Sequence, residues 1–295
     1  MHASKYRGEL RHNEPMSRHT AWGVGGMAAS FFEPTGIDDL ANFLTTFSER
    51  EPIFWLGLGS NVLVRDGGIN GAVIRTSGLL NGLREPRLGV IRAEAGVTNA
   101  GFARFCAKCG LGGSEFLAGI PGTVGGALAM NAGAFGGETW AIVTQVETLD
   151  RKGVRRIRKP VDFDIGYRDV RPPEGEWFVA AEFALERKDR EEVALEIQEL
   201  LQRRRNQQPT HMRSCGSVFR NPPGEYAGYL IDRCGLKGLR IGGAVVSDKH
   251  ANFILNTGMA TASDIEALMG RVAAIVEQKT GVRLISEVRI IGDKV

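Results

Sequence analysis

The sequence is poor in the residues and segments that several function classes require. Its 4 cysteines and 5 histidines form no cluster with the spacing of a metal site, and they are too few for a disulfide framework. No apolar run reaches the roughly 18 residues of a membrane span, and no secretory leader precedes the cysteines. The 37 basic and 34 acidic residues leave a net charge of +3, which gives no electrostatic footprint for nucleic acid or an anionic membrane. We therefore expect a soluble cytoplasmic protein that needs no metal and binds neither nucleic acid nor a membrane.

Glycine is the one abundant residue in an otherwise ordinary composition. The hydrophobic fraction of 43% and the charged fraction of 24% are typical of soluble globular proteins, and 295 residues suffice for two domains or one large domain with an insertion. Glycine supplies 39 of the 295 residues, roughly 13% against a usual share of about 7%. Ten of these glycines lie among the 28 residues from 110 to 137. The excess is therefore local and needs a local explanation.

Hydrophobic patterning predicts a mixed fold of strands and helices. Short apolar runs predict strands at 52–56, 62–64, 72–75, 90–95, 143–150, 154–157 and 178–185, and helical spacing predicts helices at 38–49, at 98–109 and from 189 to the basic run before Pro209. A last helix is expected to start at Ser263, with Glu266 completing a capping box, and to stop at Gly281. The tail 282–291 alternates in polarity and would put Glu287 and Arg289 on one face of a strand. Residues 1–19 are polar and are expected to form an arm with little core of its own.

The glycine turn after the first predicted strand has two interpretations. Gly57 and Gly59 resemble the start of a Rossmann fingerprint, but position 62 is valine in place of the third glycine and no helical pattern follows. None of the glycine clusters contains the Gly-Lys-Ser/Thr of a P-loop. Ser60 and Asn61 beside exposed backbone N–H groups would suit a diphosphate. A diphosphate-binding turn and a plain tight turn both remain open.

Several other motifs are ambiguous when each is taken alone. The run 119–126 and the segment 131–134 are uncharged and rich in glycine, so they either let backbone approach a flat ligand or form a bend that packs strands. Cys106 and Cys109 lie on a helical pattern without a second pair of metal ligands, and we expect buried thiols. Residues 248–250 favour a polar loop over an acid/base site. The loop around Ser217 has no obvious Ser/His/Asp set.

Taken together, the motifs occur in one order along nearly the whole chain. They are His19-Thr20-Ala21-Trp22 with Gly25-Gly26, and the segments 58–63, 119–126, 131–134, 166–169, 215–219, 227–232 and 286–289. In order and spacing they resemble the UDP-N-acetylenolpyruvoylglucosamine reductase (MurB) family of bacterial cell-wall synthesis, in its short form without an inserted tyrosine loop. The glycine segments alone would indicate only the wider class of flavoproteins with the vanillyl-alcohol-oxidase type of FAD fold.

The resemblance implies an α+β fold with a two-part FAD-binding region of the vanillyl-alcohol-oxidase type and a smaller α+β substrate-binding domain. The implied boundaries are 1–78 with 283–295 for the first FAD-binding part, 79–207 for the second and 208–282 for the substrate-binding domain. The implied activity is NADPH-dependent reduction of UDP-N-acetylglucosamine enolpyruvate to UDP-N-acetylmuramate, in peptidoglycan precursor synthesis, by a monomer with non-covalent FAD. A flavin or nucleotide-sugar sensor of the same fold and an oxidase are the alternatives.

The resemblance also implies a role for each matching residue. Arg168 would bind the substrate carboxylate, Glu287 would donate to the developing enolate if protonated, and Ser217 would protonate the carbanion. FAD would contact Gly57, Gly59, Ser60, Asn61, Val62, Leu63, Gly119, Ile120, Pro121, Gly122, Thr123, Gly125, Gly126, Asn131, Ala132, Gly133 and Arg289. The uridine diphosphate and the sugar would contact Tyr167, Arg204, Asn221, Tyr229 and Lys237.

Overall fold

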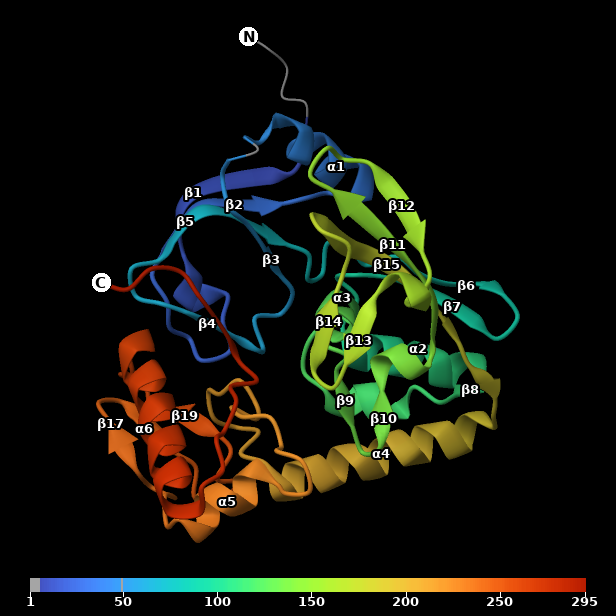
Figure 1. The fold of residues 1–295 in the computed structure, drawn as a ribbon. Helices are drawn as coiled ribbons and strands as arrows, with labels where there is room; N and C mark the ends of the chain where they lie inside the picture. The colour runs from blue at the N-terminus through green and yellow to red at the C-terminus, as the bar shows by residue number, and fades with distance from the viewer. Residues whose placement is uncertain (1–5, 49) are drawn as a thin grey trace. The chain divides into compact units, whose positions relative to one another are not determined.

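Segments that are distant in the sequence combine to form two compact units. The computed structural model describes residues 6–48 and 50–295. Unit 1 contains the chain up to Arg11 together with residues 30–58 and 71–203, and unit 2 contains residues 12–29, 59–70 and 204–295 (Figure 1). No helix within the described ranges combines the length and the apolar character that crossing a membrane takes.

Unit 1 is built around a five-stranded antiparallel sheet in the order β12-β11-β15-β7-β6 (Figure 1). Its strands are β6 (Leu83–Arg87), β7 (Val90–Glu94), β11 (Val143–Asp150), β12 (Arg155–Arg158) and β15 (Glu176–Ala184), so the strands predicted here are confirmed to within two residues. Helices α2 (Asn99–Cys109) and α3 (Val124–Ala129) belong to the same hydrophobic core. Phe102 of α2 packs on Phe183 of β15 with ring centroids 4.6 Å apart. This core supports the glycine-rich run.

A second core of unit 1 forms around helix α1 (Ile37–Thr46). Phe43 of α1 stacks on Phe32, with ring centroids 3.8 Å apart. Strand β3 (Ile53–Leu56) pairs in parallel with β5 (Ile69–Arg75). Their sheet also contains β1 (Glu9–Pro15) and β2 (Met27–Glu33), in the order β1-β2-β5-β3. The predicted strands at 52–56 and 72–75 and the predicted helix at 38–49 are confirmed, although Glu49, the expected end of that helix, lies outside the described residues.

The prediction of a polar arm for residues 1–19 is wrong for the part that the structure describes. Strand β1 (Glu9–Pro15) is an outer strand of its sheet next to β2 (Met27–Glu33), and Met16 is fully buried. An outer strand keeps one edge in water, so a polar sequence is compatible with regular structure there. The polarity of this segment reflects an exposed edge and not a lack of structure.

Unit 2 is centred on helix α6 (Ala262–Thr280), which packs with α5 (Ala227–Arg233) and an antiparallel sheet of β17 (Arg240–Ile241), β18 (Ala244–Val246) and β19 (Ile254–Asn256) (Figure 1). The predicted end at Gly281 is confirmed, with φ at 74°. The predicted start is wrong, because Thr261 is the N-cap and Asp264 closes the capping box. Ser263 instead donates its hydroxyl to Asp66 (2.6 Å), and Glu266 pairs with Arg65 (2.9 Å).

The end of the chain returns to the glycine turn. Strand β20 (Arg289–Ile291) pairs in parallel with β4 (Val62–Val64), the predicted second strand. The predicted alternation of the tail is confirmed in burial, since Leu284 and Val288 are buried between exposed or half-buried neighbours. It is not one continuous strand, because only residues 289–291 form a regular ladder with β4.

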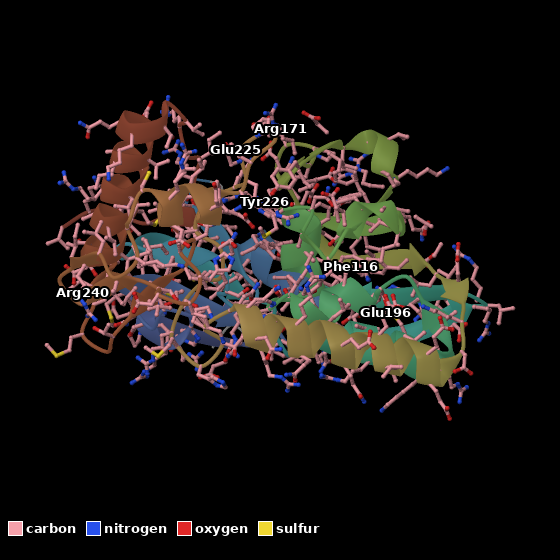
Figure 2. The ribbon with its side chains drawn as sticks, turned by 90° about the horizontal axis from the view of Figure 1, so that it is seen from below. Phe116, Arg171, Glu196, Glu225, Tyr226 and Arg240 are labelled. Carbon is pink, nitrogen blue, oxygen red and sulfur yellow. The ribbon has the colours of Figure 1, made fainter. Side chains whose placement is uncertain are left out.

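Short hairpins and one long helix complete the chain. The hairpins are β9 (Gly133–Ala134) with β10 (Gly137–Glu138) and β13 (Asp164–Gly166) with β14 (Asp169–Arg171), and a further short pair joins the distant strands β8 (Leu111–Gly112) and β16 (Glu186–Arg187). The helix predicted from 189 is confirmed as α4 (Arg190–Gln207), and it contains the boundary between the units at 203 and 204. Lys188 precedes it and pairs with Glu192 (3.2 Å) and Glu196 (2.8 Å). Glu196 is labelled on α4 in Figure 2.

Candidate active site

In unit 1 the predicted cofactor segment 119–126 lies against residues 95–99. The backbone N–H groups of Val124 and Gly125 donate to the carbonyl oxygens of residues 97 (2.8 Å) and 95 (2.9 Å). Thr123 caps α3, and its Oγ1 accepts from the N–H of Gly126 at 3.4 Å. A Cβ at Gly125 would lie 2.8 Å from the Cβ of Ala95, so this approach requires glycine. Close packing therefore accounts for Gly125.

Gly57 and Gly126 differ in the room that they leave beside the backbone. A Cβ at Gly57 would lie 2.5 Å from Oγ1 of Thr123, so the end of β3 contacts the run directly. At Gly126, in contrast, the nearest atom to a Cβ would be Oγ1 of Thr123 at 3.7 Å, and the space above this backbone is open within the part of the chain that is described. An open glycine backbone is a cradle that a Cβ would narrow, and it fits the close approach of a flat or diphosphate-bearing group such as FAD.

Arg168 lies at the tip of the hairpin between β13 and β14. Gly166 pairs with Asp169, so Tyr167 and Arg168 form a two-residue turn. The φ of Arg168 is 56°, a left-handed conformation that costs a residue with a side chain about 1–2 kcal/mol. Its Cζ lies 5.0 Å from the ring centroid of Tyr167. Strain of this kind persists where the surrounding structure or the function requires the residue.

Asn131 connects the Arg168 hairpin to the loop at 131–140. Asn131 is buried, and its carbonyl oxygen accepts from Nη1 of Arg168 at 3.1 Å, while Nη2 donates to the carbonyl of Gly133. Its Nδ2 donates to the carbonyl of Gly166 (3.2 Å) and to Oε2 of Glu138 (3.1 Å). The structure thus brings together three predicted site residues of unit 1, and the side chain of Asn131 has a structural role beside its predicted role at the cofactor.

In unit 2, Asn61 joins the glycine turn to the end of the chain. Its Nδ2 donates to the carbonyl of Glu287 (3.0 Å), and its own carbonyl accepts from the N–H of Arg289 (3.1 Å). Gly59 has φ at 66°, and a Cβ there would overlap the carbonyl oxygen of His19, so the turn requires glycine. The predicted residues from 59 to 63 therefore lie beside Glu287 and Arg289.

Ser217 lies next to the same terminal segment. The N–H of Glu287 donates to the carbonyl of Val218 (2.8 Å), and the N–H of Arg220 donates to the carbonyl of Ile285 (2.9 Å). Residues 218–220 therefore run antiparallel to residues 285–287. Ser217 is half-buried, immediately before this pairing. The structure thus brings the backbone of the predicted proton donor close to that of the predicted acid.

The cysteines have the properties of inert thiols. Burial raises the pKa of Cys106 to about 12 and that of Cys215 to about 12, so both stay protonated near neutral pH. The Sγ of Cys215 lies 3.7 Å from the carbonyl oxygen of Val62. Cys106 is buried as predicted, and Cys109 is half-buried. Among the described residues no group of His, Cys, Asp and Glu could hold a metal ion.

The residues predicted to bind the nucleotide sugar are divided between two places in unit 2. Three of them surround α5: Oδ1 of Asn221 accepts from the N–H of Ala227 (3.1 Å), Lys237 pairs with Asp232 (2.6 Å), and Tyr229 is exposed. Arg204 lies instead near the end of α4, where its Nε donates to Oε1 of Gln208 (3.2 Å). Burial lowers the pKa of the Arg204 guanidinium. The fifth predicted residue, Tyr167, belongs to unit 1.

Sequence patterns missed one residue of this region, Asn252. It is 3% exposed, and its side chain hydrogen-bonds to both backbone groups of Phe219, two residues after Ser217. It follows the predicted polar loop 248–250, and a single asparagine there carries no local signal of a partner more than thirty positions away. Only the folded chain reveals the contact.

Comparisons with known proteins cover nearly the whole chain. The profile of the family described as "UDP-N-acetylenolpyruvoylglucosamine reductase, C-terminal domain" matches residues 208–291, and that of the family described as "FAD binding domain" matches residues 28–157. A UDP-N-acetylenolpyruvoylglucosamine reductase of Alkalilimnicola ehrlichii is 56% identical over 97% of this chain and 96% of the relative. One of Methylococcus capsulatus is 54% identical over 99% of this chain and 96% of the relative.

A solved structure agrees with these relatives. The crystal structure of the UDP-N-acetylenolpyruvylglucosamine reductase of Thermus caldophilus superposes with a TM-score of 0.80 at 33% sequence identity, over 97% of this chain and 99% of that one. The predicted α+β fold with an FAD-binding region and a second domain is confirmed by these matches. On identity and coverage, the chain belongs to the UDP-N-acetylenolpyruvoylglucosamine reductase family.

Proposed function

We propose that the protein uses NADPH to reduce the enolpyruvyl group of UDP-N-acetylglucosamine enolpyruvate to the lactyl ether of UDP-N-acetylmuramate, a step of peptidoglycan precursor synthesis. Family membership along the whole chain and the FAD-binding domain at 28–157 support this activity. When bound, FAD would supply the hydride chemistry that connects NADPH with the enolpyruvyl alkene. We place the reaction in the cytoplasm, carried out by a monomer.

Residues of both units hold FAD in this proposal, without a covalent bond. The open backbone at Gly126 and the contact between Gly57 and Thr123 support a diphosphate-binding role for unit 1. In unit 2, the turn at Ser60 and Asn61 is the corresponding element, because it lies beside Arg289. The proposed division is 1–78 with 283–295 and 79–207 for FAD, and 208–282 for the substrate.

Arg168 binds the carboxylate of the enolpyruvyl group. A guanidinium has five N–H donors in a planar fork, which suits a carboxylate better than a point charge does. The carbonyl oxygens of Asn131 and Gly133 hold the group in place, and the left-handed backbone aims it from the hairpin tip. A fixed cation near the developing negative charge lowers the barrier without reorganisation during the reaction.

Glu287 and Ser217 handle the proton. Hydride delivery leaves negative charge on the carbon beside the carboxylate, and a protonated Glu287 donates a hydrogen bond to the enolate form. Ser217 then gives its hydroxyl proton to that carbon. A C–H bond forms, the O–H bond of Ser217 breaks, and the serine oxygen recovers a proton from water. The observation that supports this assignment is the bond between the N–H of Glu287 and the carbonyl of Val218, the residue that follows Ser217.

The remaining polar residues bind the uridine diphosphate and the sugar. Lys237, Arg204 and Tyr229 supply two cations and a hydroxyl, which suit phosphate oxygens and ring hydroxyls. Asn221 uses its Oδ1 at the start of α5, so we assign its Nδ2 to the ligand. The ring of Tyr167 lies beside the Arg168 guanidinium and supplies an apolar surface for the enolpyruvyl end of the substrate.

The variant Ser217→Ala tests the assignment. It should leave the reduction of bound FAD by NADPH close to the wild-type rate, because Ser217 has no role in that half-reaction. Reoxidation by the enolpyruvyl substrate should slow by about 10²–10⁴-fold, the usual size of a lost general acid. Stopped-flow absorbance near the flavin band measures both rates. Equal losses in the two half-reactions would exclude Ser217 as the proton donor.

A further inference from the structure

Asn252 is buried and holds the backbone that follows Ser217. Its side chain is 3% exposed, in the loop before β19. The Oδ1 accepts from the N–H of Phe219 at 2.9 Å, and the Nδ2 donates to the carbonyl of Phe219 at 2.8 Å. A residue has one backbone donor and one backbone acceptor, so this single carboxamide satisfies both groups of Phe219. No other side-chain type of the same size supplies that pair.

The restraint extends to Val218 and from there to Glu287. The backbone carbonyl of Asn252 accepts from the N–H of Val218 (2.8 Å), and the carbonyl of Val218 accepts from the N–H of Glu287 (2.8 Å). Val218 is fully buried between these two partners. Movement of Asn252 is therefore transmitted to the segments of both proton-handling residues.

The other side of Ser217 offers much less restraint. Gly216 has φ at 73°, and apart from its two chain neighbours no described residue comes within 4 Å of where its Cβ would be. Glycine is the most flexible residue of a chain, so the preceding backbone fixes Ser217 weakly. The position of the serine hydroxyl thus depends on the two residues that follow it, and these are the residues that Asn252 holds.

We propose that Asn252 is a positioning residue that sets the geometry of Ser217 for proton transfer, an inference that rests on the proposed role of Ser217. Asn252 itself does not touch the reacting atoms. Proton transfer to carbon depends steeply on placement, and a displacement of about 1 Å costs on the order of a hundredfold in rate. Loss of the carboxamide pairing is expected to produce an effect of this size in one half-reaction only.

The variant Asn252→Asp keeps the shape of the side chain and replaces the donating Nδ2 by an oxygen that faces the carbonyl of Phe219. Reoxidation of the reduced flavin by the enolpyruvyl substrate should slow by about a hundredfold, while reduction by NADPH should change less than about twofold. Hydrogen–deuterium exchange provides a readout independent of catalysis: the amides of Val218 and Phe219 should exchange faster than in the wild type. Asn252→Ser avoids a buried charge and gives the same comparison if the aspartate variant does not retain FAD.

Asn256→Asp is a matched control in the same unit. Asn256 is 4% exposed, and its Nδ2 donates to the carbonyl of Trp22 at 2.8 Å. Its Oδ1 accepts from the N–H groups of Gly258 (2.8 Å) and Ala260 (3.1 Å), so these side-chain bonds do not involve residues 217–219. This variant should lose stability without changing the ratio of the two half-reaction rates. A selective loss of reoxidation in Asn256→Asp as large as in Asn252→Asp would overturn the proposal, because general softening of the unit would then explain both.

A double-mutant cycle separates this inference from the function on which it rests. If Asn252 acts through Ser217, Asn252→Asp should add less than about twofold to the reoxidation defect in a Ser217→Ala background. A further hundredfold loss in that background would refute the positioning role while leaving the proton-donor role intact. Equal losses in both half-reactions of Ser217→Ala alone would refute the proton-donor role instead.

Discussion

The left-handed backbone at Arg168 predicts a reversal of the usual order of alanine and glycine. Arg168→Ala and Arg168→Gly both remove the guanidinium and its bonds to the carbonyl oxygens of Asn131 and Gly133, so both should lose reoxidation by the substrate to the same extent. The two variants differ only in the Cβ. With φ at 56°, that Cβ is the source of strain. The difference in stability between the variants therefore reports the strain of this Cβ, offset by the greater flexibility of glycine in the unfolded chain.

The size of the difference follows from two opposing terms. A left-handed conformation costs an L-residue about 1–2 kcal/mol, whereas glycine at an ordinary position is less stable than alanine by about 0.4–1 kcal/mol because its unfolded chain is more flexible. At position 168 the glycine variant should thus be the more stable by roughly 1 kcal/mol. Arg171, exposed on β14 of the same hairpin (Figure 2), has no positive φ and serves as the control. There the alanine variant should be the more stable by about 0.5–1 kcal/mol.

Thermal unfolding of the four variants in excess FAD measures both differences. For a chain of 295 residues, 1 kcal/mol shifts Tm by about 1.5–2 °C, so the two pairs should differ in opposite directions by about 1–2 °C. A higher Tm for alanine than for glycine at both positions would show that the backbone at Arg168 is not strained. It would also remove the reason to infer that the turn keeps Arg168 for its guanidinium. Equal stability loss in all four variants, with activity retained at 168, would remove Arg168 from the site.

Two further predictions concern the elements that support the site. Burial raises the pKa of Asp66, but hydrogen bonds from Ser263 and Ala262 outweigh this effect and hold the pKa below the usual 3.8, so the stabilisation is present at neutral pH and is lost as the pH falls through the folded pKa. In urea unfolding, Asp66→Asn should lower the free energy of unfolding by about 1–2 kcal/mol at pH 7, and this loss should shrink toward zero below that pKa. A loss that does not depend on pH would contradict the prediction. The new Cβ of Gly57→Ala would push the Thr123 hydroxyl away from the N–H of Gly126, so a fluorescence titration should show weaker binding of FAD. This effect should largely disappear in a Thr123→Ala background. If Gly57→Ala has its full effect in that background, the clash is not the cause.

Elements with a strong local signal were predictable from the sequence. The strand at 143–150 alternates and is recovered at both ends, and the helix at 98–109 starts one residue later than expected. The predictions were wrong where a residue distant in the sequence bonds to the residues of a predicted local motif. Asp66 and Arg65 pair with Ser263 and Glu266, the two residues of the expected capping box, and the cap moved to Thr261. Nothing near residue 263 in the sequence announces those partners.

The candidate site shows the same division. Gly59 was predictable as a turn glycine, because the alternation of short strands around it demands a reversal. The hydrogen bond from Asn61 to the carbonyl of Glu287 was not predictable, because the two residues are 226 positions apart and every residue has a backbone carbonyl. The family resemblance assigned the roles of Asn61 and Glu287, and the structure shows the hydrogen bond that joins them.

These long-range contacts imply that stability and catalysis are coupled in unit 2. Asn61, Val218 and Asn252 position the segments of the proposed acid and proton donor. Val218 does so through bonds between backbone groups, whereas Asn61 and Asn252 also use their side chains. A bond between backbone groups cannot be retuned by substituting the residue that carries it. Substitution can change this geometry at Asn61 and Asn252, because the side-chain amide of each donates to a backbone carbonyl oxygen. Substitutions there should impair proton transfer at a smaller loss of stability than substitutions in the apolar core around α6, where a buried side chain such as Leu268 has no contact role beyond packing.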